Sequence, residues 1–438
     1  MKIKTENMSY DEVLDLEPYK NKKPVSQGRF WRWLLKTASE PELKKVSFSC
    51  EEEDMDRLRK KEPALYLMNH SSFIDLKIAS SIIYPRPFHI VCTMDGFVGK
   101  EGLLRMIGCI PTRKFMNDTT LVRDMLYTVR ELKESVLLYP EASYTFDGTA
   151  TPLPDSLGKA VKMLGVPVIM IRTYGAFARD PLYNGLQVRD VKVSAKMSYL
   201  LSAEEISSMS AAEINEILRR HFSFDNFRWQ QENHISVSED FRADGLERVL
   251  YKCPHCLEEG CMKGKGISLK CTNCGAEYEL TEFGKLRQIK TPAQSSDQAS
   301  GRTAADSITF EHIPDWYAWE REEVRKEIES GIYCMKEKSD IIMLVNTDAV
   351  YRVGEGILRH DINGFHLTGC EGKLNYHQIP ERSYSLYSDY FWYEIGDMIS
   401  IGTPKIQYYC FPKNENAIVA KARLAAEELF KLSRHGNK

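Results

Sequence analysis

Residues 64–75 read Ala64-Leu-Tyr-Leu-Met-Asn-His-Ser-Ser-Phe-Ile-Asp75 and give the clearest prediction of local structure in the sequence. Its first five residues are apolar and predict a buried strand, and the apolar spacing that follows predicts a helix over residues 74–84. Ser71 or Ser72 is a suitable N-cap for that helix, because a serine oxygen accepts hydrogen bonds from the first free amides. The stretch therefore predicts a strand, a short polar loop and a helix.

His70 and Asp75 lie five residues apart in this stretch. Five residues turn a continuous helix by about 140°, so the two side chains meet only if His70 lies in the loop and Asp75 in the first helical turn. Asp75 would then fix the imidazole tautomer and leave the other nitrogen free as a base toward an alcohol. The structural alternative is that Ser72-x-x-Asp75 is a capping box and that His70 only satisfies loop backbone groups.

The first half of the chain alternates short apolar strands with amphipathic helices, which is the pattern of a layered α/β fold. Val166 to Thr173 predicts a buried strand, Val188 to Tyr199 alternates like a strand, and residues 203–222 have helical spacing. We therefore expect an α/β domain over residues 46–245, with a mixed sheet flanked by helices.

Three further segments follow the His70 stretch, each beside a predicted strand. Gly108-Cys-Ile-Pro-Thr-Arg113-Lys114 ends a short strand on two cations, Tyr139-Pro-Glu-Ala-Ser-Tyr-Thr145 follows a second strand, and Val166-Pro-Val168 begins a third. With these blocks, residues 62–176 resemble the glycerolipid acyltransferase family, whose type members are the 1-acylglycerol-3-phosphate acyltransferases. That family has a histidine, four residues and an aspartate, then a block ending in arginine, a Phe-Pro-Glu-Gly-Thr-Arg block and an apolar Val-Pro strand.

The resemblance implies a role for each matched residue. His70 would be the general base on the acceptor hydroxyl, with Asp75 orienting it. Arg113, with Lys114 beside it, would hold an anionic acceptor group such as a glycerol phosphate, and Glu141 would help to position the acceptor or organise the site. The donor would be a fatty acyl thioester on coenzyme A or acyl carrier protein, without a catalytic metal. Taken singly, Arg113 could be a solvated charge and Glu141 an acid at a helix N-terminus.

The third block departs from the family at Ala142-Ser143-Tyr144, where the family has Gly-Thr-Arg. The missing arginine removes one phosphate contact that the resemblance implies, so either Arg113 and Lys114 compensate or the acceptor is not lysophosphatidate. We expect acyl transfer to the hydroxyl of a lysophospholipid such as 1-acylglycerol-3-phosphate, in phospholipid biosynthesis. The alternatives are a non-phosphorylated or amine acceptor, and a catalytically silent lipid-binding scaffold or sensor; the presence of all the matched residues favours an enzyme.

Composition limits the cellular setting. The chain has 438 residues, 43% of them hydrophobic and 28% charged, with a net charge of −3, which fits several globular domains and argues against a chain-wide polyanion binder. No apolar run approaches the roughly 18 residues of a membrane span, and the N-terminus lacks the apolar core of a signal peptide. We therefore expect a cytoplasmic protein.

The N-terminal segment over residues 1–45 is basic and aromatic. Between Lys20 and Ser39 there are six basic residues and no acidic one, and Arg29-Phe-Trp-Arg-Trp-Leu-Leu-Lys36 lies within that stretch. Aromatic rings and arginines together suit the headgroup boundary of a lipid bilayer. The segment predicts peripheral contact with the cytosolic face of a membrane, and the alternative is a helix packed on the α/β domain.

Two Cys-x-x-Cys pairs, separated by fourteen residues, define a region over residues 246–288: Cys253 with Cys256, and Cys271 with Cys274. Four thiolates with this spacing predict a structural zinc site resembling a zinc ribbon, because a closed Cys₄ shell suits tetrahedral Zn²⁺. His255 and Cys261 are expected to be bystanders. Nucleic acid is disfavoured as a partner, because only three lysines of the region would support it.

Beyond a linker over residues 289–308, we expect a β-rich domain over residues 309–438. Asn363-Gly364 between two apolar runs predicts a hairpin, and the last residues have helical spacing. Several strands followed by one helix are similar in layout to pleckstrin-homology-like domains. The sequence alone gives this domain no function.

Overall fold

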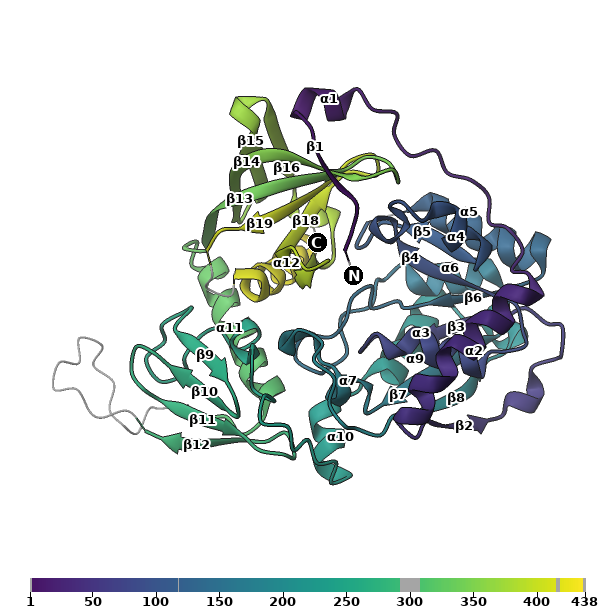
Figure 1. Cartoon of the computed structure of the whole chain (residues 1–438), viewed down its shortest axis with the longest axis horizontal. Coiled ribbons are helices and arrows are strands. Elements are labelled where there is room, and N and C mark those ends of the chain that lie inside the picture. The colour runs from purple at the N-terminus through teal and green to yellow at the C-terminus, as the bar shows by residue number, and fades with distance from the viewer. Residues whose placement is uncertain (1, 117, 292–307, 415–417, 436–438) are drawn as a thin grey trace.

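The computed structural model describes residues 2–116, 118–291, 308–414 and 418–435. The described residues form three β-sheets, one each in the α/β region, the cysteine-rich region and the C-terminal region. Figure 1 shows the three regions arranged around a common centre, with α11 and α12 between them. Among the helices of the described residues, none combines the length and the apolar character that a bilayer crossing needs.

The α/β region is built on a seven-stranded mixed sheet with the order β2-β8-β7-β3-β6-β4-β5. Strands β3 to β7 run parallel to one another, and β8 joins β7 in the antiparallel direction. This mixed sheet confirms the expected fold of the region. Its strands are β2 (Ser49–Glu53), β3 (Leu65–Met68), β4 (Phe88–Thr93), β5 (Cys109–Thr112), β6 (Ser135–Leu138), β7 (Val168–Tyr174) and β8 (Ser194–Leu201).

Helices cover both faces of this sheet, and the strand sequence explains why. Tyr66 and Met68 of β3 pack into one apolar cluster with α3, whereas Leu65 and Leu67 pack into another with α6 and α9. A parallel strand buried on both faces must be apolar at every position, as β3 is. The helices of this region are α2 (Arg29–Lys45), α3 (Ile74–Ile82), α4 (Glu101–Met106), α5 (Thr119–Tyr127), α6 (Leu157–Leu164), α7 (Ala176–Arg179), α8 (Ala203–Ser208), α9 (Ala211–Phe222) and α10 (Asn226–Glu232).

Two predicted elements differ from the structure. The strand expected over residues 188–199 begins only at Ser194, because the preceding residues form a loop. The helix expected over residues 203–222 is two helices, α8 and α9. The break comes at Ser210, whose side chain accepts a hydrogen bond from the Glu213 amide in a capping box and so starts a new helix.

The cysteine-rich region contains a four-stranded antiparallel sheet with the order β12-β11-β10-β9. Its strands are β9 (Met262–Lys265), β10 (Ser268–Cys271), β11 (Glu277–Leu280) and β12 (Leu286–Lys290). The expected linker over residues 289–308 begins inside β12 and otherwise lies almost wholly outside the described residues, which omit 292–307. The region therefore has a small sheet of its own, with Cys271 at the end of β10 and Cys274 in the connection to β11.

The C-terminal region contains the largest sheet, with the antiparallel order β16-β15-β14-β13-β19-β18-β17, and a long helix packs against it. The predicted hairpin is present, but Asp361 pairs with Gly364, so the two loop residues are Ile362 and Asn363. The elements are α11 (Ile313–Glu329), β13 (Cys334–Leu344), β14 (Val350–Asp361), β15 (Gly364–Gly369), β16 (Leu374–Gln378), β17 (Tyr387–Trp392), β18 (Gly396–Gly402), β19 (Gln407–Pro412) and α12 (Ile418–His435).

The N-terminal segment is divided between two regions. Strand β1 (Thr5–Asn7) pairs in parallel with β14, and Val13 of helix α1 (Tyr10–Leu14) is buried in the C-terminal core. Helix α2 instead lies across the α/β region, as the purple helix in Figure 1 shows. The expected single segment over residues 1–45 is therefore two pieces with different neighbours.

The C-terminal sheet packs directly on the α/β region. Tyr387 and Trp392 of β17 each donate a hydrogen bond to Asp95, at 2.8 and 3.0 Å, and Asp95 lies in the turn after β4. An apolar cluster continues across this contact, joining Phe115 to the rings of β17 and β19. This contact brings the C-terminal region to the edge of the α/β sheet where its parallel strands end.

Candidate active site

Three of the four sequence blocks each place a residue at one edge of the α/β sheet. His70 follows β3, Arg113 follows β5, and Glu141 follows β6, so each lies just beyond the carboxyl end of a parallel strand. The carboxyl ends of parallel strands share one sheet edge, which is the usual place for a ligand site in such folds. The fold therefore collects residues from 70 to 141 in one place.

His70 and Asp75 form the pair that the sequence predicted. The Nδ1 atom of His70 lies 3.0 Å from Oδ2 of Asp75, with His70 in the loop and Asp75 in the first turn of α3. Asp75 is fully buried, whereas one fifth of the His70 side chain (20%) is exposed. Because Nδ1 is engaged by the carboxylate, the second ring nitrogen is the one available for chemistry.

Asp75 is held by the same loop that it orients. Its Oδ2 atom accepts hydrogen bonds from the amides of Ser71 and Ser72, at 2.8 and 3.1 Å. Ser72 does not complete the predicted capping box, because its hydroxyl accepts from the Ile74 amide at 3.2 Å and donates to Asp180. The carboxylate therefore serves the loop backbone and the imidazole together.

The His70 ring lies against two tyrosine rings. The ring centroids of Tyr139 and Tyr144 are each 4.2 Å from that of His70. Burial lowers the pKa of His70 below its usual value, the charge of Lys114 lowers it further, and Asp75 opposes both. The imidazole is therefore neutral at pH 7, which is the form that can accept a proton.

Glu141 is a buried support for the His70 loop. Its two carboxylate oxygens accept hydrogen bonds from the amides of His70, at 2.9 Å, and Thr151, at 2.8 Å. Burial raises the pKa of Glu141 to about 7, although these amides oppose the shift. The next residue, Ala142, has a φ of 57°, a left-handed conformation that favours glycine. That conformation gives a physical reason for the glycine that the family has at this position.

Arg113 and Lys114 have different surroundings. Lys114 is half-buried, its Nζ lies 4.3 Å from the centre of the Tyr387 ring, and its charge acts on Asp389 and His70. The charged and phenolic groups that act on Arg113 are Asp118 and two tyrosines, Tyr19 and Tyr409. Among the described residues, neither cation makes a hydrogen bond or ion pair with His70 or Asp75. Lys114 is thus the cation whose field reaches the imidazole.

The C-terminal region contributes to this site, which the sequence did not predict. Arg423 of α12 donates from Nη2 to the hydroxyl of Ser143 at 3.1 Å. Asp389 of β17 has a pKa raised to about 7 by burial, with Lys114 opposing the shift. No local pattern could have revealed these contacts, because Ser143 and Arg423 are 280 positions apart.

The chain was also compared with protein families and with solved structures. A family model described as Acyltransferase matches residues 49–173, which contain all four sequence blocks. Residues 49–173 form an acyltransferase-family domain. The match confirms the family that the sequence blocks resembled, over nearly the same part of the chain.

Part of the chain is also similar to one solved structure. The 1-acyl-sn-glycerophosphate (LPA) acyltransferase PlsC from Thermotoga maritima is similar at 14% sequence identity and a TM-score of 0.36. The similarity covers 44% of this chain and 78% of that one. No curated protein matches the chain.

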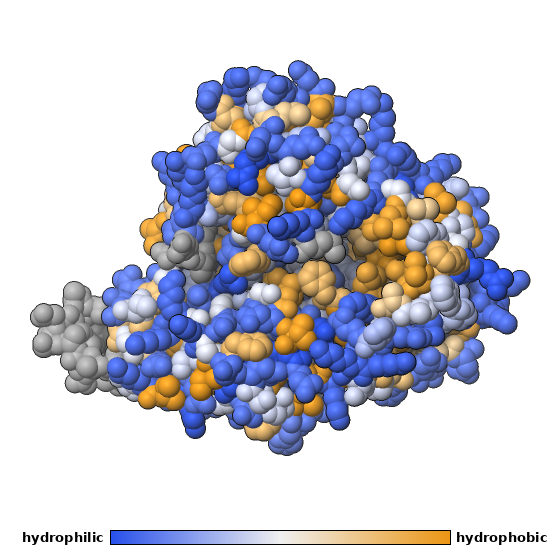
Figure 2. Space-filling view, in the orientation of Figure 1, coloured by the Kyte–Doolittle hydropathy of each residue, from blue (hydrophilic) through white to orange (hydrophobic). Residues whose placement is uncertain are grey.

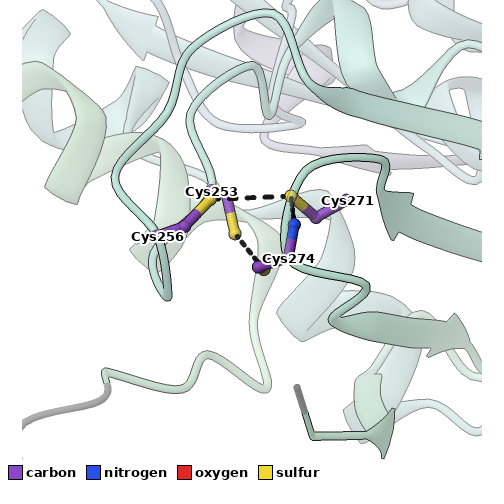
Figure 3. Close-up of side chains that lie close together, drawn as sticks. All are labelled: Cys253, Cys256, Cys271 and Cys274. Atoms are coloured by element: carbon purple, nitrogen blue, oxygen red, sulfur yellow. Dashed lines mark hydrogen bonds between the residues drawn. The ribbon is translucent and has the colours of Figure 1, made fainter. Parts of the chain in front are cut away.

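A second site lies outside the acyltransferase domain. The sulfur atoms of Cys253, Cys256, Cys271 and Cys274 all lie within 4.8 Å of one another, pointing toward a common centre in Figure 3. Two of the sulfur pairs are 3.7 Å apart. Four thiolates about 2.3 Å from a tetrahedral Zn²⁺ would be about 3.8 Å apart, so the arrangement fits a metal ion.

The two cysteine pairs have the same local geometry. In each pair the amide after the second cysteine bonds back to the carbonyl of the first, from Leu257 at 2.9 Å and from Gly275 at 3.0 Å. Both residues have positive φ, 64° for Leu257 and 77° for Gly275. Cys261 was expected not to be a metal ligand. Its sulfur lies 3.4 Å from that of Cys271. The repeated turn aims both sulfurs of each pair at the same point.

Proposed function

We propose that the chain transfers a fatty acyl group from an acyl thioester, on coenzyme A or acyl carrier protein, to the hydroxyl of a lysophospholipid such as 1-acylglycerol-3-phosphate, as a step of phospholipid biosynthesis. The observation that supports this proposal best is the His70–Asp75 pair inside an acyltransferase-family domain. Its free ring nitrogen, its neutral imidazole and its partial exposure are what a general base toward an alcohol requires.

The chemistry needs one proton acceptor and no covalent enzyme intermediate. The free nitrogen of His70 takes the hydroxyl proton as the acceptor oxygen forms a bond to the thioester carbon. The carbon–sulfur bond then breaks, and the thiolate takes the proton back from the imidazolium. Asp75 stabilises that imidazolium while it exists, because its buried carboxylate is 3.0 Å away. Glu141 fixes the backbone of the base rather than touching the reacting atoms.

The acceptor end of the site has an unusual neighbour. Tyr144 stands where the family has arginine, and its ring packs on the imidazole instead of offering a cation. The charge of Lys114 acts on His70, and its Nζ lies 4.3 Å from the centre of the Tyr387 ring. We propose that Arg113 and Lys114 contribute to binding of the acceptor phosphate, as the resemblance implies. Because Tyr144 offers no cation at this position, a non-phosphorylated acceptor is the second candidate.

A membrane surface is the proposed location of the acceptor. Exposed apolar side chains lie on α2, α3 and α4, and Gln27 before α2 bonds to the Ile107 carbonyl after α4. In Figure 2, hydrophobic residues (orange) gather over the α4 side of the visible face. Phe73, 58% exposed, stacks edge-on with Tyr144 beside His70. An apolar surface next to the base would admit a lipid from the bilayer to the site, with the chain peripheral on the cytosolic face.

The two remaining regions are proposed as supports. The four cysteines would hold a structural Zn²⁺ in a zinc ribbon, and elemental analysis for one zinc per chain tests this. For the C-terminal region we propose a pleckstrin-homology-like domain. Strands β13 to β16 form one consecutive run in the sheet, and β17 to β19 form another. The pairing of β13 with β19 joins the two runs, and the single helix α12 follows, as in that layout.

Thiol release from palmitoyl-coenzyme A tests the activity directly. Release by the wild type is measured with and without lysophosphatidate, and the same assay is run on His70→Ala. Release that depends on the acceptor and disappears in the variant supports the proposal. Release in neither case, with acyl carrier protein and other acceptors also tried, overturns it.

A further inference from the structure

Arg423 is a buried cation that reaches the acyltransferase domain from the last helix of the chain. It is 3% exposed, its Nη2 atom donates to Ser143 at 3.1 Å, and its guanidinium lies 4.2 Å from the centre of the Phe146 ring. Ser143 and Phe146 belong to the third sequence block and to the loop after it. A side chain of α12 is therefore packed into the segment where the family has its arginine.

The charge of Arg423 is only partly compensated. Its nearest carboxylate is Glu427, with Nε 3.4 Å from Oε1. Glu427 also pairs with Arg321 at 2.7 Å, so one carboxylate serves two guanidinium groups. The Nη1 atom of Arg423 is buried and has no hydrogen-bond partner. A buried N–H donor without an acceptor is costly, and a ligand anion would satisfy it.

Arg423 contacts the third block one residue before the position where the family has its arginine. Ser143 immediately precedes Tyr144, whose ring lies against His70. Lys114 lies over the ring of Tyr387, and the charges of Lys114 and Arg423 act on each other. Two cations from distant parts of the chain thus lie close enough for their charges to interact.

We propose that Arg423 binds the phosphate monoester of the acceptor and replaces the arginine that Tyr144 displaced from the third block. The proposal rests on the proposed acyltransferase function and names its substrate class, a lysophospholipid with a terminal phosphate. A guanidinium already anchored through Nη2 offers a second, oriented N–H to a phosphate oxygen. The C-terminal region then belongs to the acceptor site and determines its specificity.

The test compares acceptors and donors with and without phosphate. For Arg423→Gln, KM for lysophosphatidate should rise about tenfold or more, because one charge-assisted contact is lost. KM for palmitoyl-coenzyme A, and for the palmitoyl thioester of N-acetylcysteamine, should stay unchanged. Turnover of monoacylglycerol, which has no phosphate, should also be unchanged. A rise in KM for palmitoyl-coenzyme A alone would mean that Arg423 binds the donor phosphate, and would overturn the proposal.

Two further variants separate binding from folding. Arg434→Gln makes the same change at an exposed position of α12 and should leave every KM unchanged. Adding Tyr144→Arg to Arg423→Gln should restore much of the affinity for lysophosphatidate, because it returns a cation to the family position. A purely structural Arg423 would show no such rescue. If Arg423→Gln does not fold, Arg423→Lys takes its place, and an unchanged KM for lysophosphatidate in that variant overturns the proposal.

A direct binding measurement tests the anion site at Arg423 separately from acyl transfer. Titration calorimetry of glycerol 3-phosphate into the full chain needs no turnover. Binding that Arg423→Gln abolishes and Arg434→Gln preserves supports the anion site even if no acyl transfer is found. Binding that is equal in all three proteins overturns the role of Arg423 even if acyl transfer is found.

Discussion

The acyltransferase domain contains two histidine–carboxylate pairs, and they have opposite characters. His70 lies 3.0 Å from Asp75 in the loop after β3, and His89 lies 2.7 Å from Glu134 beside the start of β4. The His70 side chain is 20% exposed, whereas that of His89 is 1% exposed. The shorter and better-buried pair is thus the one that substrate cannot reach.

The partners of the two carboxylates explain the difference. Glu134 also accepts hydrogen bonds from the Ser26 hydroxyl and the Gln27 amide, so it ties the segment before α2 to the sheet. Asp75 accepts from the loop that carries its own histidine. The first carboxylate joins two distant segments, and the second aims one side chain. A histidine–carboxylate pair indicates catalysis only when its second nitrogen remains accessible.

Removal of His70 should have the largest effect on activity. We expect His70→Ala to lower kcat about 10³-fold, because general base catalysis contributes roughly that factor. The unfolding transition should change little, since the side chain is partly exposed. Thiol release and thermal unfolding of the same preparation give both values. A variant that keeps most of its activity would remove His70 from the role of base.

Removal of His89 should do the reverse. His89→Ala leaves the Glu134 carboxylate buried without its imidazole, and breaking such a pair costs about 3 kcal/mol of unfolding free energy. The kcat of the folded fraction should equal that of the wild type. Urea unfolding combined with active-site titration separates the two quantities. A loss of kcat without a loss of stability would show that the two pairs do not differ as described.

Neutralising each carboxylate should repeat this contrast on a smaller scale. Asp75→Asn should lower kcat about 100-fold, the lower end of what general base catalysis contributes, because an amide cannot stabilise the imidazolium as a carboxylate does. Glu134→Gln should cost about 1–2 kcal/mol of stability, since the hydrogen bonds from His89, Ser26 and Gln27 lose their charged acceptor. Steady-state kinetics and unfolding curves check the pair. Equal kinetic effects would contradict the assignment of Asp75 as the orienting group.

The parts of the site that could be predicted from the sequence are those that neighbours in the chain determine. His70 and Asp75 meet because one loop and one helical turn hold them, and each cysteine pair aims its sulfurs through one local turn. Strand β3 was predictable because a strand buried on both faces is apolar at every position. The family was predictable because its four blocks, and their order along the chain, are visible in the sequence itself.

The parts that escaped prediction depend on distant contacts. Arg423 meets Ser143 only because α12 packs against the acyltransferase domain, and no periodicity in either segment indicates this. Strand β1 pairs with β14, although its sequence is too short to show a partner. The roles of Arg113 and Lys114 were predicted together, yet side chains of adjacent residues point apart and meet different neighbours.

The pH dependence of activity should follow His70 and not Glu134. Because burial lowers the pKa of His70, kcat/KM should rise with pH through a midpoint below 6.5 and stay level at neutral pH. Burial opposes ionisation of Glu134, but hydrogen bonds from His89, Ser26 and Gln27 lower its pKa below 4.5. The stability that Glu134 contributes is therefore present above 4.5 and lost only at more acid pH. Paired pH titrations of rate and of unfolding check the two directions. A midpoint above 6.5 would contradict the assignment of a buried, neutral base.

The smallest expected effect concerns the residue after Glu141. Ala142 has a φ of 57°, which costs an L-residue about 1 kcal/mol relative to glycine. Ala142→Gly should therefore raise the unfolding free energy by about 1 kcal/mol, less the extra entropy that glycine gives the unfolded chain. The same substitution in a right-handed helix, Ala160→Gly in α6, should lower it by about 0.5–1 kcal/mol.

Opposite signs for these two variants in urea unfolding would show that the conformation at 142 is the cause. Glu141 bonds to the amide of His70, so relief of strain beside it also tests whether the base is held in place by the third block. We expect kcat to stay within about twofold of the wild type, because the hydrogen bonds of Glu141 do not depend on the methyl group of Ala142. A stabilised protein with a much lower kcat would mean that the strain at Ala142 itself positions His70. The strained backbone at Ala142 would then be a second feature of the His70 pair that the His89 pair lacks.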